Sequence, residues 1–195
     1  MWNSLFKKIS LDWIMKLLSS MKTKNDQKYN SILTVIYHII KYALFILTWN
    51  DTTAADFMKL FFEHVKCHFD SLRSIMTDRN SCITSDFWQE VCKIQLIKQC
   101  LSTAYHSQTD DQSEVLNQII KNYLRAYTSE DQTVWAKLLS LAQFIYNNSH
   151  NHIIQMSSNQ LLHEFNCEIH IDIMNNVIKR RISAVKNHVE KLYKL

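Results

Sequence analysis

Apolar and polar residues alternate through the first fifty positions in the way that is typical of β-strands. In residues 9–14, ISLDWI, the odd-numbered residues are apolar and share one face, whereas Ser10 and Asp12 fall on the other. Residues 31–37 (SILTVIY) and 42–48 (YALFILT) are apolar and rich in β-branched side chains, which favours two further strands. Three strands in succession predict an antiparallel meander. An acid such as Asp12 is costly to bury in a strand unless it is paired, liganded or at a solvent-facing end.

Beyond Asp51 the apolar residues take up the three-to-four-residue spacing of helices. The elements predicted, in chain order, are a helix over 51–69, a strand over 74–77, a helix over 84–93, a return to the sheet over 94–101, a long helix around Glu114 and a helix over 133–148. Asp51 or Thr52 is a suitable cap for the first helix. In the helix over 84–93 we expect Phe87, Trp88 and Val91 to face inward. This order of elements predicts one α/β domain with a mixed sheet.

The helix around Glu114 has two distinct faces. Its apolar stripe, at helical spacing, consists of Leu116, Ile120, Tyr123, Leu124 and Tyr127. Its polar face carries Glu114, Gln118, Lys121 and Arg125, which is one acid followed by two cations. A solvated surface is the simplest interpretation of such a face, unless other acids in the chain converge on it.

Composition indicates a globular protein of one domain. The chain has 195 residues, of which 47% are hydrophobic and 21% are charged. The formal net charge of +4 is mildly basic, which is compatible with a nucleic-acid partner but is weak evidence for one. No apolar run approaches the ~20 residues of a membrane span. Lysines and Asp12 interrupt the apolar residues near the N-terminus, so we expect no signal peptide and no secretion.

Cysteine, glycine and proline add further constraints. The five cysteines show no CxxC spacing, which is typical of reduced thiols in an intracellular protein. His64 and Cys67 have no second ligand pair at zinc-finger spacing, so we expect no zinc site. Glycine and proline are both absent, although average usage in a chain of this length would give roughly 14 and about 10. We therefore expect Asn, Asp or Ser at tight turns and helix ends, and reduced stability.

Three acids stand at the ends or centres of predicted elements that can meet at one edge of the sheet. Asp12 lies on the first strand, Asp78 ends the strand over 74–77, and Glu114 opens the long helix, with 35 residues between Asp78 and Glu114. Converging carboxylates suit hard divalent cations, which prefer oxygen ligands. Two such ions about 4 Å apart activate an attacking oxygen and stabilise the leaving oxygen of a phosphodiester.

The same segments carry a family resemblance. The strings SLDWI, SIMTDRNSCITSDFW, LSTAYHSQTDDQSEVLNQ, YNNSHN and QMSSNQLLHEFN resemble successive motifs of retroviral-type integrase catalytic cores. The resemblance is closest to the integrases of gypsy-type LTR retrotransposons and covers about residues 5–175. It implies a ribonuclease-H-like α/β fold, with a five-stranded mixed sheet flanked by helices, over residues 1–165. Residues 166–195 are rich in Lys and Arg, and we expect them to form a basic helical tail.

The resemblance also implies a reaction. Asp12, Asp78 and Glu114 match the three metal ligands of a DDE-type polynucleotidyl transferase, which uses two Mg²⁺ or Mn²⁺ ions. In this family water, and then a DNA 3′-hydroxyl, attacks a phosphodiester, so that DNA is cleaved and strands are transferred. Lys121 and Arg125 would then face DNA phosphates, which explains why cations share a helix face with an acid.

Further residues and partners follow from the same resemblance. His106, Gln108 and Arg79 neighbour the acids and are candidates for contacting DNA or ordering the loop. The implied partners are the DNA of the element ends and of the target, with RNA as a further nucleic acid, and a homo-oligomer. The implied location is the nucleus, after a cytoplasmic stage. The zinc-binding N-terminal and the C-terminal modules of full integrases have no counterpart here, so we expect the core alone to integrate poorly.

Several positions depart from the family pattern. Asn80 stands where glycine usually follows the Asp-Arg pair, and Ser107 and Asp111 replace a proline and a glycine of the catalytic loop. His38 and Ile39 occupy a place where an Asp-Arg pair is common. Most changes are Gly to Asp, Asn or Ser and Pro to Ser or Leu, as transition mutations in DNA would produce. Our hypothesis is a decayed element copy in which the three acids survive and catalytic activity is in doubt.

Two alternative functions remain open on the sequence. One is a non-catalytic DNA- or RNA-binding remnant that keeps the fold and its basic surface. The other is a different ribonuclease-H-like nuclease, which the match of the loop strings to integrases disfavours.

Overall fold

A five-stranded mixed sheet organises the computed structural model, which describes residues 8–21, 28–67, 72–77, 81–101, 107–127 and 134–165. The strands lie in the order β5-β4-β1-β6-β7, with bounds β1 Lys8–Ile14, β4 Ser31–Tyr37, β5 Ala43–Thr48, β6 Ser74–Thr77 and β7 Lys98–Leu101. β4 pairs antiparallel with both β1 and β5, which confirms the predicted meander. β6 and β7 continue the sheet in parallel from β1, so the predicted mixed sheet is also confirmed.

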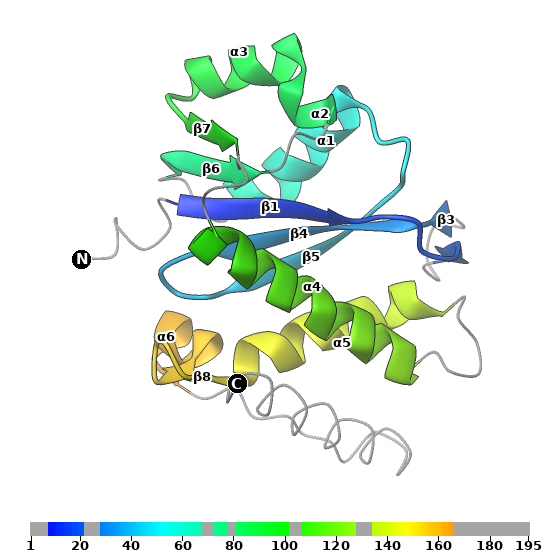
Figure 1. Ribbon diagram of the computed structural model, residues 1–195, viewed down its shortest axis with the longest axis vertical. Helices are drawn as coiled ribbons and strands as arrows, with labels where there is room; N and C mark the ends of the chain where they lie inside the picture. The colour runs from blue at the N-terminus through cyan, green and yellow to red at the C-terminus, as the bar shows by residue number, and fades with distance from the viewer. Residues whose placement is uncertain are drawn as a thin grey trace.

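Helices cover both faces of this sheet (Figure 1). One layer contains α1 (Ala54–Phe61), the π-helical turn η2 (Phe62–Lys66), α2 (Ser81–Thr84) and α3 (Asp86–Ile94); the other contains α4 (Ser107–Tyr127) and α5 (Trp135–Asn148). Two short hairpins, β2 (Ser20–Met21) with β3 (Lys28–Tyr29) and β8 (His150–Asn151) with β9 (Met156–Ser157), and α6 (Ser158–His163) complete the described part. None of the helices in these ranges is long and apolar enough to cross a membrane.

The alternation of β1 divides its side chains between two cores. Ile9 and Leu11 pack with Phe57 and Trp88 in the layer of α1 and α3. Ile14 instead packs with the apolar stripes of α4 and α5. Helices therefore pack on both faces of β1, and Ser10 and Asp12 point toward the α4 side because they share the face of Ile14.

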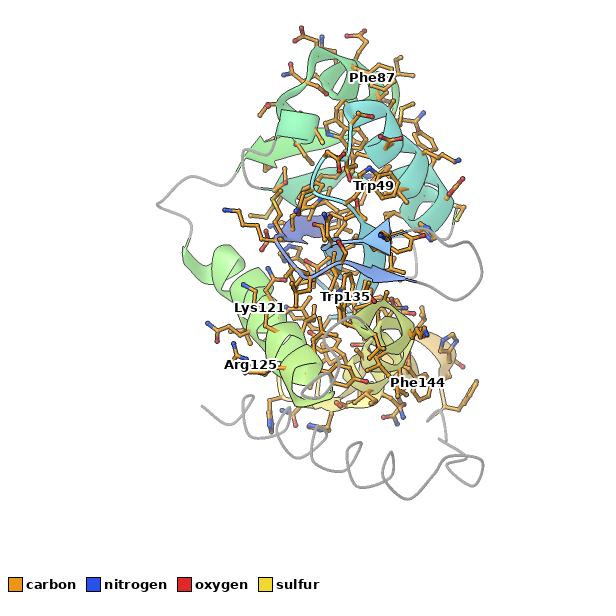
Figure 2. The ribbon with its side chains drawn as sticks, turned by 90° about the vertical axis from the view of Figure 1, so that its right-hand side faces the viewer. Trp49, Phe87, Lys121, Arg125, Trp135 and Phe144 are labelled. Atoms are coloured by element: carbon orange, nitrogen blue, oxygen red, sulfur yellow. The ribbon has the colours of Figure 1, made fainter. Side chains whose placement is uncertain are left out.

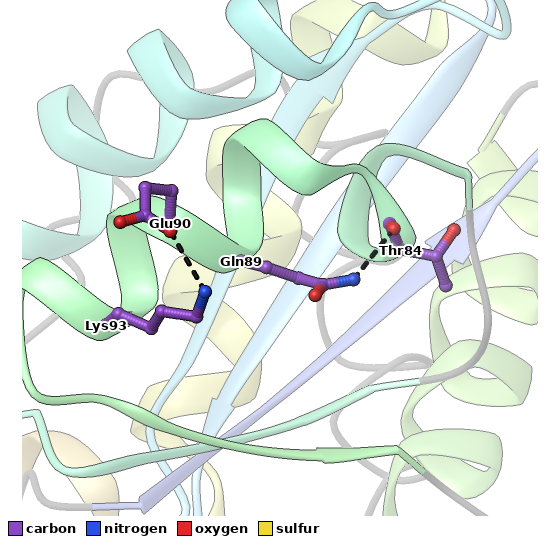
Figure 3. Close-up of polar contacts among 4 residues, drawn as sticks. All are labelled: Thr84, Gln89, Glu90 and Lys93. Atoms are coloured by element: carbon purple, nitrogen blue, oxygen red, sulfur yellow. Dashed lines mark hydrogen bonds and ion pairs between the residues drawn. The ribbon is translucent and has the colours of Figure 1, made fainter.

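The helix predicted over 84–93 is divided in two by Ser85. The hydroxyl of Ser85 accepts a hydrogen bond from the Trp88 backbone N–H and caps α3, while α2 ends at Thr84. Figure 3 shows the polar contacts of α3, in which the Gln89 amide donates to the Thr84 carbonyl. Trp88 is buried and Val91 half-buried as predicted, but the prediction for Phe87 is wrong. This side chain is 47% exposed, because the buried stripe of α3 runs through Trp88 and Cys92 instead.

The start of α1 also differs from the prediction. Thr53, and neither Asp51 nor Thr52, caps this helix, and Thr53 and Asp56 form a reciprocal capping box. The Thr52 hydroxyl donates instead to the Trp49 carbonyl and stabilises the turn that precedes the helix.

Left-handed backbone conformations occur at residue types that the sequence analysis did not expect. In the described ranges, positive φ angles between 55° and 66° are found at Lys16, Lys41, Leu96, Gln155 and Glu164. The prediction that Asn, Asp or Ser would fill such positions is therefore wrong for these turns. Each of these side chains carries a Cβ penalty of about 1 kcal/mol or more that glycine would avoid.

Side chains of α5 form hydrogen bonds with backbone groups at the outer edge of β5. The Asn147 amide donates to the Ala43 carbonyl and accepts from the Ala43 N–H, each over 2.8 Å. Gln143 accepts from the Phe45 N–H over 2.8 Å. Asn147 thus imitates the hydrogen bonds of a sixth strand and protects part of a sheet edge that would otherwise be open.

Candidate metal and nucleic-acid site

Asp12 lies near the end of the central strand β1, on the face that α4 covers. Its Oδ1 accepts a hydrogen bond from the Trp13 N–H over 2.7 Å, and its Oδ2 accepts one from Asn117 Nδ2 over 2.5 Å. The side chain is half-buried. A carboxylate offers about four acceptor positions, so these two hydrogen bonds are compatible with metal ligation by the same oxygens.

Asn117 connects this carboxylate to a small polar network between α4 and the sheet. Asn117 is only 8% exposed. The Thr34 hydroxyl on β4 lies 3.3 Å from Asn117 Oδ1 and 3.0 Å from the main-chain oxygen of Asp12, and it has one hydrogen to donate between them. The sequence analysis missed Asn117 because it treated the buried face of α4 as purely apolar. The signal present in the sequence was the amide side chain of Asn117 beside the apolar residues Leu116 and Ile119.

Glu114 lies three residues before Asn117 on α4. Its Cα is therefore about 4.5 Å further back along the helix axis, which is less than one turn. The side chains of α4 before Val115 are not among the described ones. The prediction that Glu114 opens the helix is wrong, since α4 already begins at Ser107.

The remaining predicted site residues fall outside what the structure describes. Asp78, Arg79 and His106 lie outside the described residues, and Gln108 lies on α4 within the part whose side chains are not described. The strand that leads to Asp78 is described: β6 ends at Thr77, which pairs with Leu11 in the parallel register of β1 and β6. Among the described side chains, no three His, Cys, Asp or Glu residues form a metal-binding group.

Lys121 and Arg125 are exposed on α4, as Figure 2 shows, where both side chains extend away from the sheet. Gln118 on the same face is exposed as well. The opposite stripe is buried, and it consists of Leu116, Ile119, Ile120, Tyr123 and Leu124. The predicted amphipathic character of the helix is therefore confirmed, and its two cations are available to a partner.

His38 has a structural contact that the sequence did not reveal. Its Nε2 lies 2.6 Å from the Ser10 hydroxyl oxygen, which connects the β4–β5 turn to β1. Burial, reinforced by the charges of Lys8 and Lys41, lowers the pKa of His38 to about 4. The imidazole is therefore neutral at pH 7 and acts as a hydrogen-bond partner rather than as a charge.

The strand order and the helix layers are those of the ribonuclease-H-like fold of retroviral integrase catalytic cores. The core domain of HTLV-2 integrase in complex with magnesium superposes with a TM-score of 0.61 at 16% identity, covering 80% of this chain and 95% of that one. The catalytic core domain of BIV integrase gives 0.61 at 17% identity over 82% and 95%. The simian T-cell lymphotropic virus intasome, in complex with PP2A regulatory subunit B56 gamma, gives 0.64 at 18% identity over 84% and 56%.

The amino-acid sequence is similar to those of transposon polyproteins. Over 164 residues, 84% of this chain, the sequence is 27% identical to the Transposon Tf2-3 polyprotein of Schizosaccharomyces pombe, and the Tf2-4 polyprotein matches equally well. The match spans only 12% of the length of these polyproteins. No protein-family model matches the chain. The predicted resemblance is thus confirmed at two levels: the fold is that of integrase cores, and the sequence relatives are transposon polyproteins.

Proposed function

We propose that this chain is an integrase catalytic core that cleaves phosphodiesters and transfers DNA strands with two divalent ions held by Asp12, Asp78 and Glu114. The observation that carries the proposal is the hydrogen bond between Asp12 and Asn117. It brings the first acid to α4, within one helical turn of the position of Glu114.

The register of the sheet supports a place for the second acid. Leu11 and Thr77 are paired on adjacent parallel strands, and Asp12 and Asp78 are the residues that follow them in the chain. Adjacent strands are about 4.8 Å apart. β1 is thus the neighbour of the strand that leads to Asp78, and its Asp12 contacts the helix that carries Glu114, which supports the proposal that the three acids share a site.

The chemistry of this donor set fits Mg²⁺ or Mn²⁺, because all three ligands are hard carboxylate oxygens. When bound, such ions would activate the attacking oxygen and stabilise the leaving oxygen. The chain's own residues would hold and orient the ligands: Asn117 fixes one Asp12 oxygen and the Trp13 N–H fixes the other. The magnesium in the HTLV-2 core is consistent with this proposal.

Lys121 and Arg125 are proposed to bind DNA phosphates, because both are exposed on the α4 face that contains Glu114. Arg79, His106 and Gln108 are proposed as further DNA contacts from the segments beside the acids. A homo-oligomer is proposed by analogy with the HTLV-2 core, which was solved in trimeric and dimeric forms. The proposed site of action is the nucleus, where target DNA is found.

A nicking and strand-transfer assay tests the enzyme. The substrate is a labelled duplex that carries the terminal-repeat end of the parent element, incubated with Mg²⁺ or Mn²⁺. Wild type is compared with Asp78→Asn and with Asp86→Asn, an exposed acid on α3 that serves as a matched control. We expect metal-dependent products from wild type and Asp86→Asn, and none from Asp78→Asn.

Background activity in all three proteins would refute the catalytic proposal and support the decay hypothesis. Salt-dependent DNA binding that persists in all three would then identify a non-catalytic nucleic-acid-binding remnant. Failure to bind DNA as well would exclude that alternative too.

A further inference from the structure

Cations occur at the starts of β1 and β7 and just before β6. The register aligns Lys8 of β1 with Ser74 of β6, and Ser74 with Lys98 of β7. Lys8 and Lys98 are thus two strand spacings, roughly 10 Å, apart. Arg73 immediately precedes β6, and its carbonyl accepts the Lys98 N–H over 2.7 Å. All three cations are exposed, and in the described part of the chain no carboxylate forms an ion pair with them.

The β4–β5 turn adds a fourth cation. Both Lys8 and Lys41 lie close enough to His38 for their charges to contribute to lowering its pKa. Lys41 also lines a small cavity together with Val115, the residue after Glu114. We call Lys8, Lys41, Arg73 and Lys98 the strand-start cluster.

Two members of the strand-start cluster, Lys8 and Lys98, lie on the face of the sheet that contains Asp12. Lys8 and Asp12 are four residues apart and share one face of β1, so their Cα atoms are about 13 Å apart. Because Lys98 pairs with Ser74, and Ser74 with Lys8, the side chains of Lys98 and Ser74 are on this face as well. Ser74, Met76 and Cys100 are only half-buried here, whereas Ile75 on the opposite face is fully buried. This face of β6 and β7 is therefore partly open to a ligand.

Lys121 and Arg125 lie in the opposite direction from Asp12. Val115 is near Lys41, whereas Asn117 reaches Asp12, so α4 advances in the same sense as β1 (Figure 1). Lys121 is about 6 Å, and Arg125 about 12 Å, further along the helix axis than Asn117. Cations therefore flank Asp12 on both sides, over about 20 Å from Lys8 to Lys121. This length corresponds to about six base-pair steps along the axis of a DNA duplex.

We propose that the strand-start cluster is a second phosphate-binding surface for duplex DNA, separate from the one on α4. It would hold the DNA backbone where it continues past Asp12 toward the starts of β1 and β7. The inference rests on the proposed function for the choice of DNA as the polyanion, but it makes no use of the metal ions. Exposed lysines supply sequence-independent phosphate contacts, so this surface would position DNA without reading its bases.

The test is the salt dependence of DNA binding, measured without metal. Fluorescence anisotropy with a 30-base-pair duplex, in EDTA and at several salt concentrations, compares wild type with Lys8→Gln/Lys98→Gln. The control is Lys59→Gln/Lys137→Gln, which removes the same charge from exposed positions on α1 and α5. We expect the cluster variant to reduce the salt slope by about 2 and the affinity by roughly ten- to sixty-fold at 0.1 M salt, whereas the control keeps the wild-type slope.

Charge rescue separates a binding role from a folding defect. Lys8→Arg/Lys98→Arg should restore the wild-type slope, and thermal unfolding should show all variants folded. Equal slopes in wild type and the Gln variant, or equal losses in the Gln variant and the control, would overturn the proposal. Because the assay contains EDTA, its result is independent of nicking activity: a failed strand-transfer assay would refute the enzyme and leave this surface intact.

Discussion

The Asn117 amide of α4 donates a 2.5 Å hydrogen bond to Oδ2 of Asp12 on β1, across 105 positions of sequence. This is the described contact that joins a predicted metal ligand to the helix that carries another. Because Asn117 is nearly fully buried and also lies within hydrogen-bond distance of Thr34, its amide has a fixed orientation. The contact therefore both packs α4 onto the sheet and sets the direction of the carboxylate.

Replacement of this amide should weaken metal binding more than it weakens the fold. For Asn117→Ala we expect a roughly ten- to hundred-fold loss of Mn²⁺ affinity, which is the usual effect of removing a residue that orients a metal ligand. We expect the free energy of unfolding to fall by about 1–3 kcal/mol in metal-free buffer. Calorimetric titration and urea unfolding measure the two quantities. Gln118→Ala, on the exposed side of α4, should change neither, and unchanged Mn²⁺ affinity in Asn117→Ala would contradict the orienting role.

We expect the side-chain amide of Asn147 to contribute strongly to the free energy of unfolding. Asn147→Asp keeps the acceptor for the Ala43 N–H but loses the donor and brings a carboxylate against the Ala43 carbonyl oxygen. We expect a loss of about 2–4 kcal/mol in the free energy of unfolding, since a buried group is left unsatisfied and charged. Gln143→Ala removes a single contact to β5 and should cost only about 1 kcal/mol. Urea melts in which Asn147→Asp resembles wild type would show that the edge of β5 does not depend on this pairing.

Leu96 offers a route to greater stability. It occupies the left-handed position after α3 with φ of 55°, and the Leu96 and Ile97 N–H groups close a Schellman motif by donating to the Lys93 and Cys92 carbonyls. The side chain is 88% exposed, so little packing is lost on its removal. Leu96→Gly should raise the free energy of unfolding by about 0.5–1 kcal/mol, the left-handed penalty less the added entropy of the unfolded chain.

Leu96→Ala distinguishes backbone relief from removal of an exposed apolar side chain. Alanine retains the Cβ and hence the left-handed penalty, so it should leave stability near the wild-type value. Equal stabilisation by Gly and Ala in thermal melts would contradict the backbone explanation.

The protonation of His38 predicts how stability depends on pH. Burial, with help from Lys8 and Lys41, holds the pKa of His38 at about 4 in the folded protein, below its ordinary value of 6.5. The unfolded chain therefore binds a proton between these values that the folded protein does not, so this residue lowers stability as pH falls from 6.5 toward 4. Above pH 6.5 its contribution is constant.

His38→Gln isolates this contribution from that of the carboxylates. Between pH 7 and 4.5 the free energy of unfolding should fall less in the variant than in wild type. Because His38 is partly solvated, we expect this difference to be of order 1 kcal/mol. Identical pH profiles of urea unfolding for the two proteins would contradict the lowered pKa.

The sequence predicted the sheet better than it predicted the turns. Alternation in ISLDWI and the β-branched runs of β4 and β5 have few structural solutions, so their faces and pairing followed from pattern alone. The break at Ser85 and the exposed Phe87 were missed because one continuous apolar pattern spans α2 and α3. Leu96 was missed because its left-handed conformation is imposed by the chain on either side and not by its own preference.

For the candidate site, the sequence pointed to three acids, of which Asp12 has a described side chain, and it did not reveal the contacts that support Asp12. Asp12 was singled out because a carboxylate within an apolar strand is costly to bury unless it is paired or liganded. In the structure it is hydrogen-bonded to Asn117 of α4. Asn117 could not be singled out by spacing, because its role arises only when α4 packs on β1. The same holds for the pairing of Asn147 with Ala43, which joins residues 104 positions apart.

Binding of Mn²⁺ to the purified chain tests the shared metal site most directly, since it requires neither a DNA substrate nor turnover. Titration calorimetry compares wild type with Asp12→Asn, Asp78→Asn, Glu114→Gln and the control Asp86→Asn. If these acids form the site, wild type and Asp86→Asn should bind Mn²⁺ saturably, and each of the other three variants should show a large loss of Mn²⁺ affinity. Wild-type affinity in any two of Asp12→Asn, Asp78→Asn and Glu114→Gln would contradict it.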